Sequence, residues 1–348
     1  MYTNAGISFQ QGKMVTFLFL LFLSHLSSLE ASQNKSEVEV LLICGGGSAV
    51  GPLAIADCEV LGAPGDGCSV PDLPIPLAEP NTVLTADGLI LNCAGWHNGP
   101  TVNKNCYYLD LEAGTWSYHS TSNFGGLWRA ETVSMPSGVY RVPSDNSEVV
   151  EFLPTGSTEW ELLPGNMPPG GWVGMSCSVP ISDFQFVVIG GVPSKFLQVI
   201  EFDTRTSSWN RWPGLGSLCS HDRLEHSCAR LGDNIVISGG SGNEFSGSCD
   251  NEEKTTTILN IPLKRVVFEG GNMNVARNDF GMAAVNGKIL AFAGFGGWNE
   301  NGGIILDSIE EKEDVVFGDW TLLPQKLVTP RYVFGWVSAP RALVCGSK

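Results

Sequence analysis

The chain has 348 residues, of which 43% are hydrophobic, and its formal net charge at pH 7 is −16. This composition excludes a disordered or collagen-like chain, because enough apolar residues are present to build a sizeable core. The negative charge disfavours nucleic acid and anionic membrane surfaces as partners, since long-range repulsion opposes both encounters. We therefore expect a compact globular protein that does not bind nucleic acid.

The N-terminus carries one apolar run, residues 14–23, which ends at Ser24 and His25. A bilayer-spanning helix needs about 20 mostly apolar residues, so the shorter run favours a secretory signal peptide over a membrane anchor. We assign residues 1–32 to the signal, with translation from Met14 as an open alternative, and residues 33–348 to one mature domain. The mature protein is then expected outside the cell, without membrane insertion, and Asn34 begins a glycosylation sequon.

A pattern of strands recurs along the rest of the chain. Each copy has a β-branched or aromatic run that ends in glycine, then a loop, a second strand and usually a tryptophan. Five copies begin at residues 40–46, 89–95, 186–191, 235–240 and 288–294, while the stretch 138–160 keeps strands and a tryptophan but lacks the glycine doublet. The tryptophans are Trp116, Trp160, Trp209 and Trp320. The spacing of about 40 to 55 residues is typical of four-stranded propeller blades.

The glycine doublets with spaced tryptophans resemble the kelch repeat. This resemblance implies an all-β fold, a kelch-type β-propeller with six blades, in which the tryptophans pack between neighbouring blades. Glycine would permit close backbone approach and positive φ at the turns around the channel. The tail at 331–338 has the character of an opening strand, so we expect it to complete blade one and close the ring. Residues 341–345 could form a further inner strand, which leaves seven blades open.

Ten cysteines are typical of an oxidising compartment once the signal peptide is accepted. Cys44 and Cys58 occupy the same repeat positions as Cys93 and Cys106, so each pair is expected to join one hairpin. Two further pairings follow less directly: Cys345 with Cys68, which would lock the ring, and Cys177 or Cys228 with a loop cysteine, Cys219 or Cys249. No C-x-x-C pair is present, so we expect no metal.

Four arginines precede inner strands by similar counts: Arg129, Arg223, Arg277 and Arg331. Blade symmetry would gather them at one mouth of the channel, where Trp172 occupies a corresponding entry. Converging guanidinium groups suit a carboxylate, sulfate or phosphate ligand. The alternative is that arginine belongs to the kelch pattern and bridges loops of adjacent blades.

These observations predict a secreted binding scaffold without a cofactor, whose partner is an extracellular protein, an acidic peptide or an anionic glycan. The alternative is a secreted carbohydrate-active enzyme, since the resemblance extends to kelch propellers of the sialic acid epimerase and galactose oxidase types. Asp279 or Glu225 could then supply acid and base groups, but we assign no catalytic residue.

Overall fold

The structure is a computed structural model that describes residues 38–48, 54–62, 68–97, 101–124, 131–142, 149–164, 174–191, 198–213, 223–241, 254–299, 302–313, 315–316 and 318–346. Every described strand belongs to one compact unit, residues 39–348. The predicted signal peptide and Asn34 lie outside the described residues and stay predictions. Among the described residues no helix is long and apolar enough to cross a membrane.

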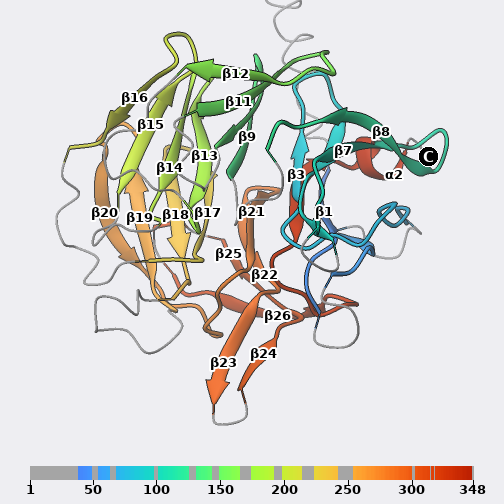
Figure 1. Ribbon diagram of the computed structural model, residues 1–348. Coiled ribbons are helices and arrows are strands. Elements are labelled where there is room, and N and C mark those ends of the chain that lie inside the picture. Colours follow the sequence, from blue (N-terminus) through green and yellow to red (C-terminus); the bar gives the residue numbers. More distant parts are fainter. Residues whose placement is uncertain are drawn as a thin grey trace, which may run out of the picture. The chain divides into compact units, whose positions relative to one another are not determined.

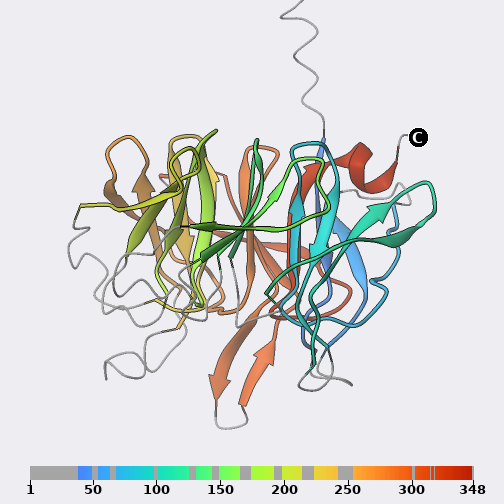
Figure 2. The same cartoon turned by 45° about the horizontal axis from the view of Figure 1, so that its top comes forward.

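Six antiparallel sheets surround a common axis and form a six-bladed β-propeller (Figures 1 and 2). From the channel outwards, blade one contains β27 (Gly335–Pro340), β1 (Glu39–Cys44) and β2 (Cys58–Leu61). Blade two contains β3 (Asn81–Leu84), β4 (Ile90–Cys93), β7 (Asn105–Asp110) and β8 (Thr115–Thr121). Blade three contains β9 (Glu131–Met135), β10 (Gly138–Val142), β11 (Val149–Pro154) and β12 (Glu161–Pro164).

The second half of the ring has the same order. Blade four contains β13 (Cys177–Ser182), β14 (Gln185–Ile189), β15 (Val199–Asp203) and β16 (Ser208–Arg211). Blade five contains β17 (Ser227–Leu231), β18 (Asn234–Ser238), β19 (Thr256–Asn260) and β20 (Arg265–Gly270). Blade six contains β21 (Gly281–Val285), β22 (Lys288–Phe292), β25 (Ser308–Lys312) and β26 (Thr321–Lys326). Small hairpins extend blades two and six: β5 (Trp96–His97) with β6 (Thr101–Val102), and β23 (Phe295–Asn299) with β24 (Gly302–Ile305).

The C-terminal strand closes the ring, as the sequence predicts. β27 pairs with β1 in antiparallel register, from Glu39 opposite Pro340 to Cys44 opposite Gly335. The segment after it, Arg341–Cys345, forms the helix α2 and not a further inner strand. The ring therefore has six blades, and the alternative of seven is wrong.

Each hydrophobic core lies between two neighbouring blades, and six such clusters complete the circle. Trp116 packs between blades one and two and Trp320 between blades five and six. Trp160 and Trp209 are half-buried against two further clusters, beside blades three and four. The interblade role predicted for these four tryptophans is confirmed.

The second glycine of a doublet lies against the loop that leads into the inner strand of its own blade, here called the entry loop. Gly240 has a φ of 97°, and a Cβ added there would lie 2.5 Å from the carbonyl oxygen of Leu224. The first glycine meets the next blade instead, because a Cβ on Gly239 would lie 2.6 Å from the carbonyl oxygen of Arg277. Only glycine accommodates both the backbone conformation and these approaches.

Four disulfides join described cysteines. Cys44–Cys58 and Cys93–Cys106 connect paired strands within blades one and two, as the repeat alignment predicts. Cys68–Cys345 ties the C-terminal helix to the first blade, also as predicted. Cys177 bonds to Cys228 and links the inner strands of blades four and five. The pairing of either residue with a loop cysteine is therefore wrong, because the two strands lie side by side at the channel.

Candidate functional site

The three described arginines of the predicted ligand site lie in equivalent places. Arg223, Arg277 and Arg331 each stand four residues before an inner strand, and they are 6%, 0% and 0% exposed. The structure therefore places these guanidinium groups inside the blades. None of the three lines the channel cavity formed by the described residues.

Arg277 shows how such a guanidinium group is held. It donates to the carbonyl oxygens of Ala293 (2.9 Å) and Ser308 (3.2 Å), and to the Glu310 carboxylate (2.8 Å). Burial lowers the pKa of Arg277, and the bond and charge of Glu310 oppose that shift. The contacts join the entry loop to the second and third strands of the same blade.

Arg331 repeats this arrangement in blade one. It donates to the carbonyl oxygens of Gly45 (2.9 Å) and Asp57 (3.0 Å), and to the carboxylates of Asp57 (2.5 Å) and Glu59 (2.8 Å). Arg223 likewise donates to the carbonyl oxygen of Thr255 at 2.9 Å. These contacts favour the structural alternative, although the arginines bridge parts of one blade and not adjacent blades. Their role in ligand binding stays a prediction.

Arg129 and Trp172 lie outside the described residues. Along the sequence, Arg129 precedes β9 by two residues, whereas the other three arginines precede their strands by four. The four arginines therefore do not share one position relative to the start of the inner strand. Their similar spacing in the sequence was measured to the turn that follows the inner strand, and not to its first residue.

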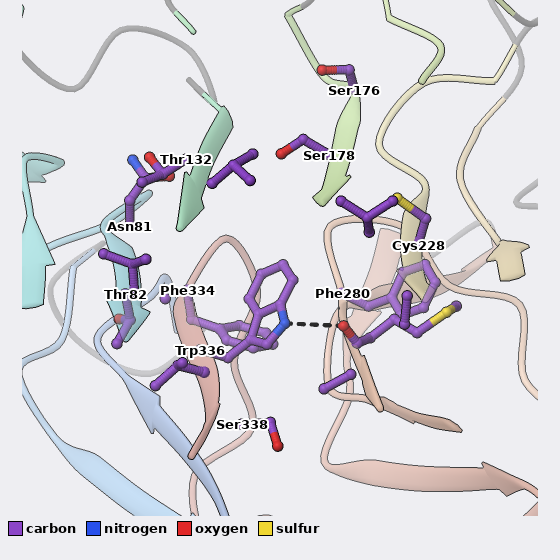
Figure 3. Close-up of a pocket in the computed structure, with 18 of the residues that line it drawn as sticks. Asn81, Thr82, Thr132, Ser176, Ser178, Cys228, Phe280, Phe334, Trp336 and Ser338 are labelled. Carbon is purple, nitrogen blue, oxygen red and sulfur yellow. Dashed lines mark hydrogen bonds between the residues drawn. The ribbon is translucent and has the colours of Figure 1, made fainter. Parts of the chain in front are cut away.

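The inner strands enclose a cavity of about 560 Å³ along the propeller axis (Figure 3). All six blades contribute to its wall through β27, β3, β9, β13, β17 and β21. Hydroxyl-bearing and aromatic side chains both line it, and Figure 3 shows Thr82, Thr132 and Ser178 on three inner strands and both Trp336 and Ser338 on a fourth, β27. Small-molecule sites in proteins are typically concave, of roughly 300–1,000 Å³, with a few placed polar groups.

A collar of residues surrounds one end of this cavity, two residues before each inner strand. Its described members are Glu79, Met175, Glu225, Asp279 and Val333. All five have positive φ, between 46° and 64°. Neighbouring blades are joined here by backbone hydrogen bonds. The N–H groups of Glu79, Glu225, Asp279 and Val333 each donate to the carbonyl oxygen of the collar member in the preceding blade.

The collar bonds are regular in length. Asp279 donates to Glu225 at 3.0 Å, Val333 to Asp279 at 3.2 Å, and Glu79 to Val333 at 2.7 Å across the closure of the ring. Non-glycine residues in this left-handed region are strained, and such residues cluster at functional sites. Three carboxylates thus lie at one mouth of the cavity, half-buried.

The sequence did not indicate the collar as a unit. From the sequence, Glu225 and Asp279 are predicted only as acid and base groups of an enzyme. No spacing in the sequence links these two residues to Glu79. The spacing that links them is their offset of two residues from each inner strand. This offset becomes visible only when the strand boundaries are known.

His226 follows the collar in blade five and is buried at 4% exposure. Its Nε2 lies 3.1 Å from the carbonyl oxygen of Ile189 in blade four, so Nε2 carries the proton and donates it. Its Nδ1 is buried without a hydrogen-bond partner. Burial, assisted by the charge of Arg223, lowers the pKa of His226 to about 3. The equivalent positions in blades six and one hold Phe280 and Phe334.

We expect His226→Phe to make the protein more resistant to acid. Between pH 6.5 and about 3 the unfolded chain binds a proton at His226 that the folded chain does not. The free energy of unfolding therefore falls as the pH is lowered, by up to about 1.4 kcal/mol per pH unit from this group. Urea unfolding at pH 7 and pH 4.5 measures the difference. An equal loss in wild type and His226→Phe would contradict the assignment.

Comparisons with known proteins support the architecture only. No family model matches the chain, and no curated protein matches it. Among solved structures, one described as "Structure of YjhT" is similar, with a TM-score of 0.61, 13% identity, and coverage of 76% of this chain and 89% of that chain. Identity at this level shows a shared propeller fold, so the kelch assignment stays a prediction.

Proposed function

We propose that this protein is an extracellular binding protein whose ligand site is the central channel. The observation that carries the proposal is the cavity of about 560 Å³, walled by all six inner strands. The ring around it is closed by β27 and by the Cys68–Cys345 bond. A cavity in such a rigid frame is pre-formed, so a ligand loses little free energy to reorganisation of the protein. The four disulfides are typical of an oxidising, extracellular environment.

The charges of the cavity favour a neutral or cationic ligand. Glu79, Glu225 and Asp279 lie at one mouth, and Arg230 is the one arginine or lysine among the described lining residues. Arg230 donates to the carbonyl oxygens of Gly232 (2.9 Å) and Pro180 (3.0 Å). An anionic partner, as predicted from the four arginines, would have to bind elsewhere. That partner remains a separate proposal.

Binding of the purified protein to an array of extracellular glycans and proteins tests the channel directly. Ser178→Phe places a bulky ring among the lining residues, whereas Ser208→Phe makes the same change on the exposed outer strand β16. We expect at least tenfold weaker binding for Ser178→Phe, because the ring occupies the ligand volume, and unchanged binding for Ser208→Phe.

Two results would contradict the proposal. One is undiminished binding by a Ser178→Phe protein whose thermal melt shows that it is folded, which would move the site to an outer face. The other is an array on which the wild type binds nothing. An array profile limited to anionic glycans would support the partner predicted from the arginines instead.

A further inference from the structure

One layer of the channel wall has two chemically different halves. The second residue of every inner strand is among the residues that line the cavity. In ring order from blade two to blade one, this girdle consists of Thr82, Thr132, Ser178, Cys228, Met282 and Trp336. Blades two to four therefore contribute three hydroxyl groups in succession. Blades five, six and one contribute a cystine, a methionine and a tryptophan, of which Cys228 and Met282 are largely buried between blades.

Within this layer, the apolar half has no hydroxyl group. Two residues farther along β27, Ser338 also lines the cavity, and its Oγ is buried without a hydrogen-bond partner. Cys228 is bonded to Cys177, so it has no thiol. The indole N–H of Trp336 donates to the carbonyl oxygen of Met282 at 3.1 Å, the bond drawn in Figure 3. Trp336 is half-buried beside Phe334, so what it offers to the cavity is its ring.

The hydroxyl half holds a polar atom that lacks a partner. Thr132 Oγ1 is buried with no hydrogen bond, although its residue lines the cavity. Thr82 Oγ1 already accepts from Asn92 Nδ2 at 2.8 Å. Buried hydroxyl groups in folded proteins are almost always hydrogen-bonded, to protein, water or ligand. Figure 3 shows Thr82 and Thr132 on the side of the cavity away from Cys228, whereas Ser178 lies on β13, next to the strand that carries Cys228.

We propose that the channel binds a neutral pyranose monosaccharide, an inference that rests on the channel being the ligand site. Such a ring carries hydroxyl groups along its edge and C–H groups on its face. Its hydroxyls would bond to Thr82 and Ser178 and, once the Thr132 side chain rotates its buried Oγ1 toward the cavity, to Thr132, and its C–H face would pack on Trp336. The carboxylates of the collar disfavour acidic sugars, because like charges repel at the mouth.

Isothermal titration calorimetry with single sugars tests the class of ligand. The panel contains glucose, galactose and mannose as neutral sugars, glucuronic acid as an anion and glucosamine as a cation. We expect at least one neutral sugar to bind wild type more tightly than either charged sugar. Thr132→Val, which keeps the side-chain shape, should weaken that binding roughly five- to tenfold. Thr321→Val, the same change on the exposed outer strand β26, should leave binding unchanged.

Each result that differs from these expectations would overturn a different part of the proposal. Tighter binding of glucuronic acid or glucosamine, or no sugar binding at all, would overturn the pyranose inference while the channel proposal stands on the Ser178→Phe result. Neutral-sugar binding that Thr132→Val leaves unchanged would overturn the assignment of the hydroxyl half. Sugar binding that survives Ser178→Phe would overturn the channel site itself.

Discussion

Arg277→Ala is expected to lower the free energy of unfolding by about 3–5 kcal/mol, because removing one member of a buried ion pair leaves the other charge uncompensated. Glu310 is 0% exposed and would lose its guanidinium partner, and the carbonyl oxygens of Ala293 and Ser308 would each lose a donor. Urea denaturation of both proteins measures the change. A second variant, Arg277→Met with Glu310→Gln, should recover part of the loss, since both charges of this ion pair are then removed.

Arg205→Ala provides the matched control for this prediction. Arg205 pairs with Asp203 at 2.7 Å, but its side chain is 58% exposed, so solvent screens the pair and we expect little change in stability. A stable Arg277→Ala protein would show that the guanidinium group is not a structural element. That result would restore Arg277 as a candidate for binding an anionic ligand.

Breaking the Cys68–Cys345 bond is expected to have an effect of similar size through the unfolded chain. The bond joins residues 277 apart, and in the chain-entropy model a loop of this length corresponds to about 5.6 kcal/mol. Cys68→Ala, Cys345→Ala and the double variant should each lose most of that stability. Thermal and urea unfolding under non-reducing conditions measure the loss.

The three variants test whether the cross-link itself is the cause of the lost stability. If the cross-link is responsible, either single substitution removes all of it, and the double variant is hardly less stable than the singles. Additive losses would show that side-chain packing, and not restriction of the unfolded chain, stabilises the closure. Cys44–Cys58 spans 14 residues, so its removal should cost less, about 3 kcal/mol from the loop.

The propeller could be predicted because its signals are local and repeated. A glycine doublet such as Gly239 and Gly240 marks a turn in every sequence window in which it occurs, and the spaced tryptophans mark blade edges. The closing strand was also predictable, since residues 331–338 have the pattern of an inner strand, and in the structure β27 pairs with β1. The segment 341–345 was ambiguous because a short apolar run does not distinguish a strand from a helix. Pro340 ends β27 and precedes the helix α2.

The roles of the arginines were not predictable in the same way. The direction of the Arg277 side chain depends on acceptors 16 and 31 residues farther along the chain, at Ala293 and Ser308. The collar shares a backbone conformation and not a side-chain type, so glutamate, methionine, aspartate and valine occupy one repeat position. The cavity and its two-sided girdle arise only when six strands are brought around one axis.

Because β27 pairs with β1, the ring can close only after the last described strand has been synthesised. β1 and β2 are the first described strands to be made, and β27 is the last. Blades two to six can each assemble from consecutive segments, whereas blade one lacks its inner strand until the ribosome has passed Pro340. Until then the inner edge of β1 is unpaired and Cys68 has no Cys345 to bond. The first blade begun is therefore the last blade finished, and a chain truncated before Gly335 would keep five complete sheets around an open gap.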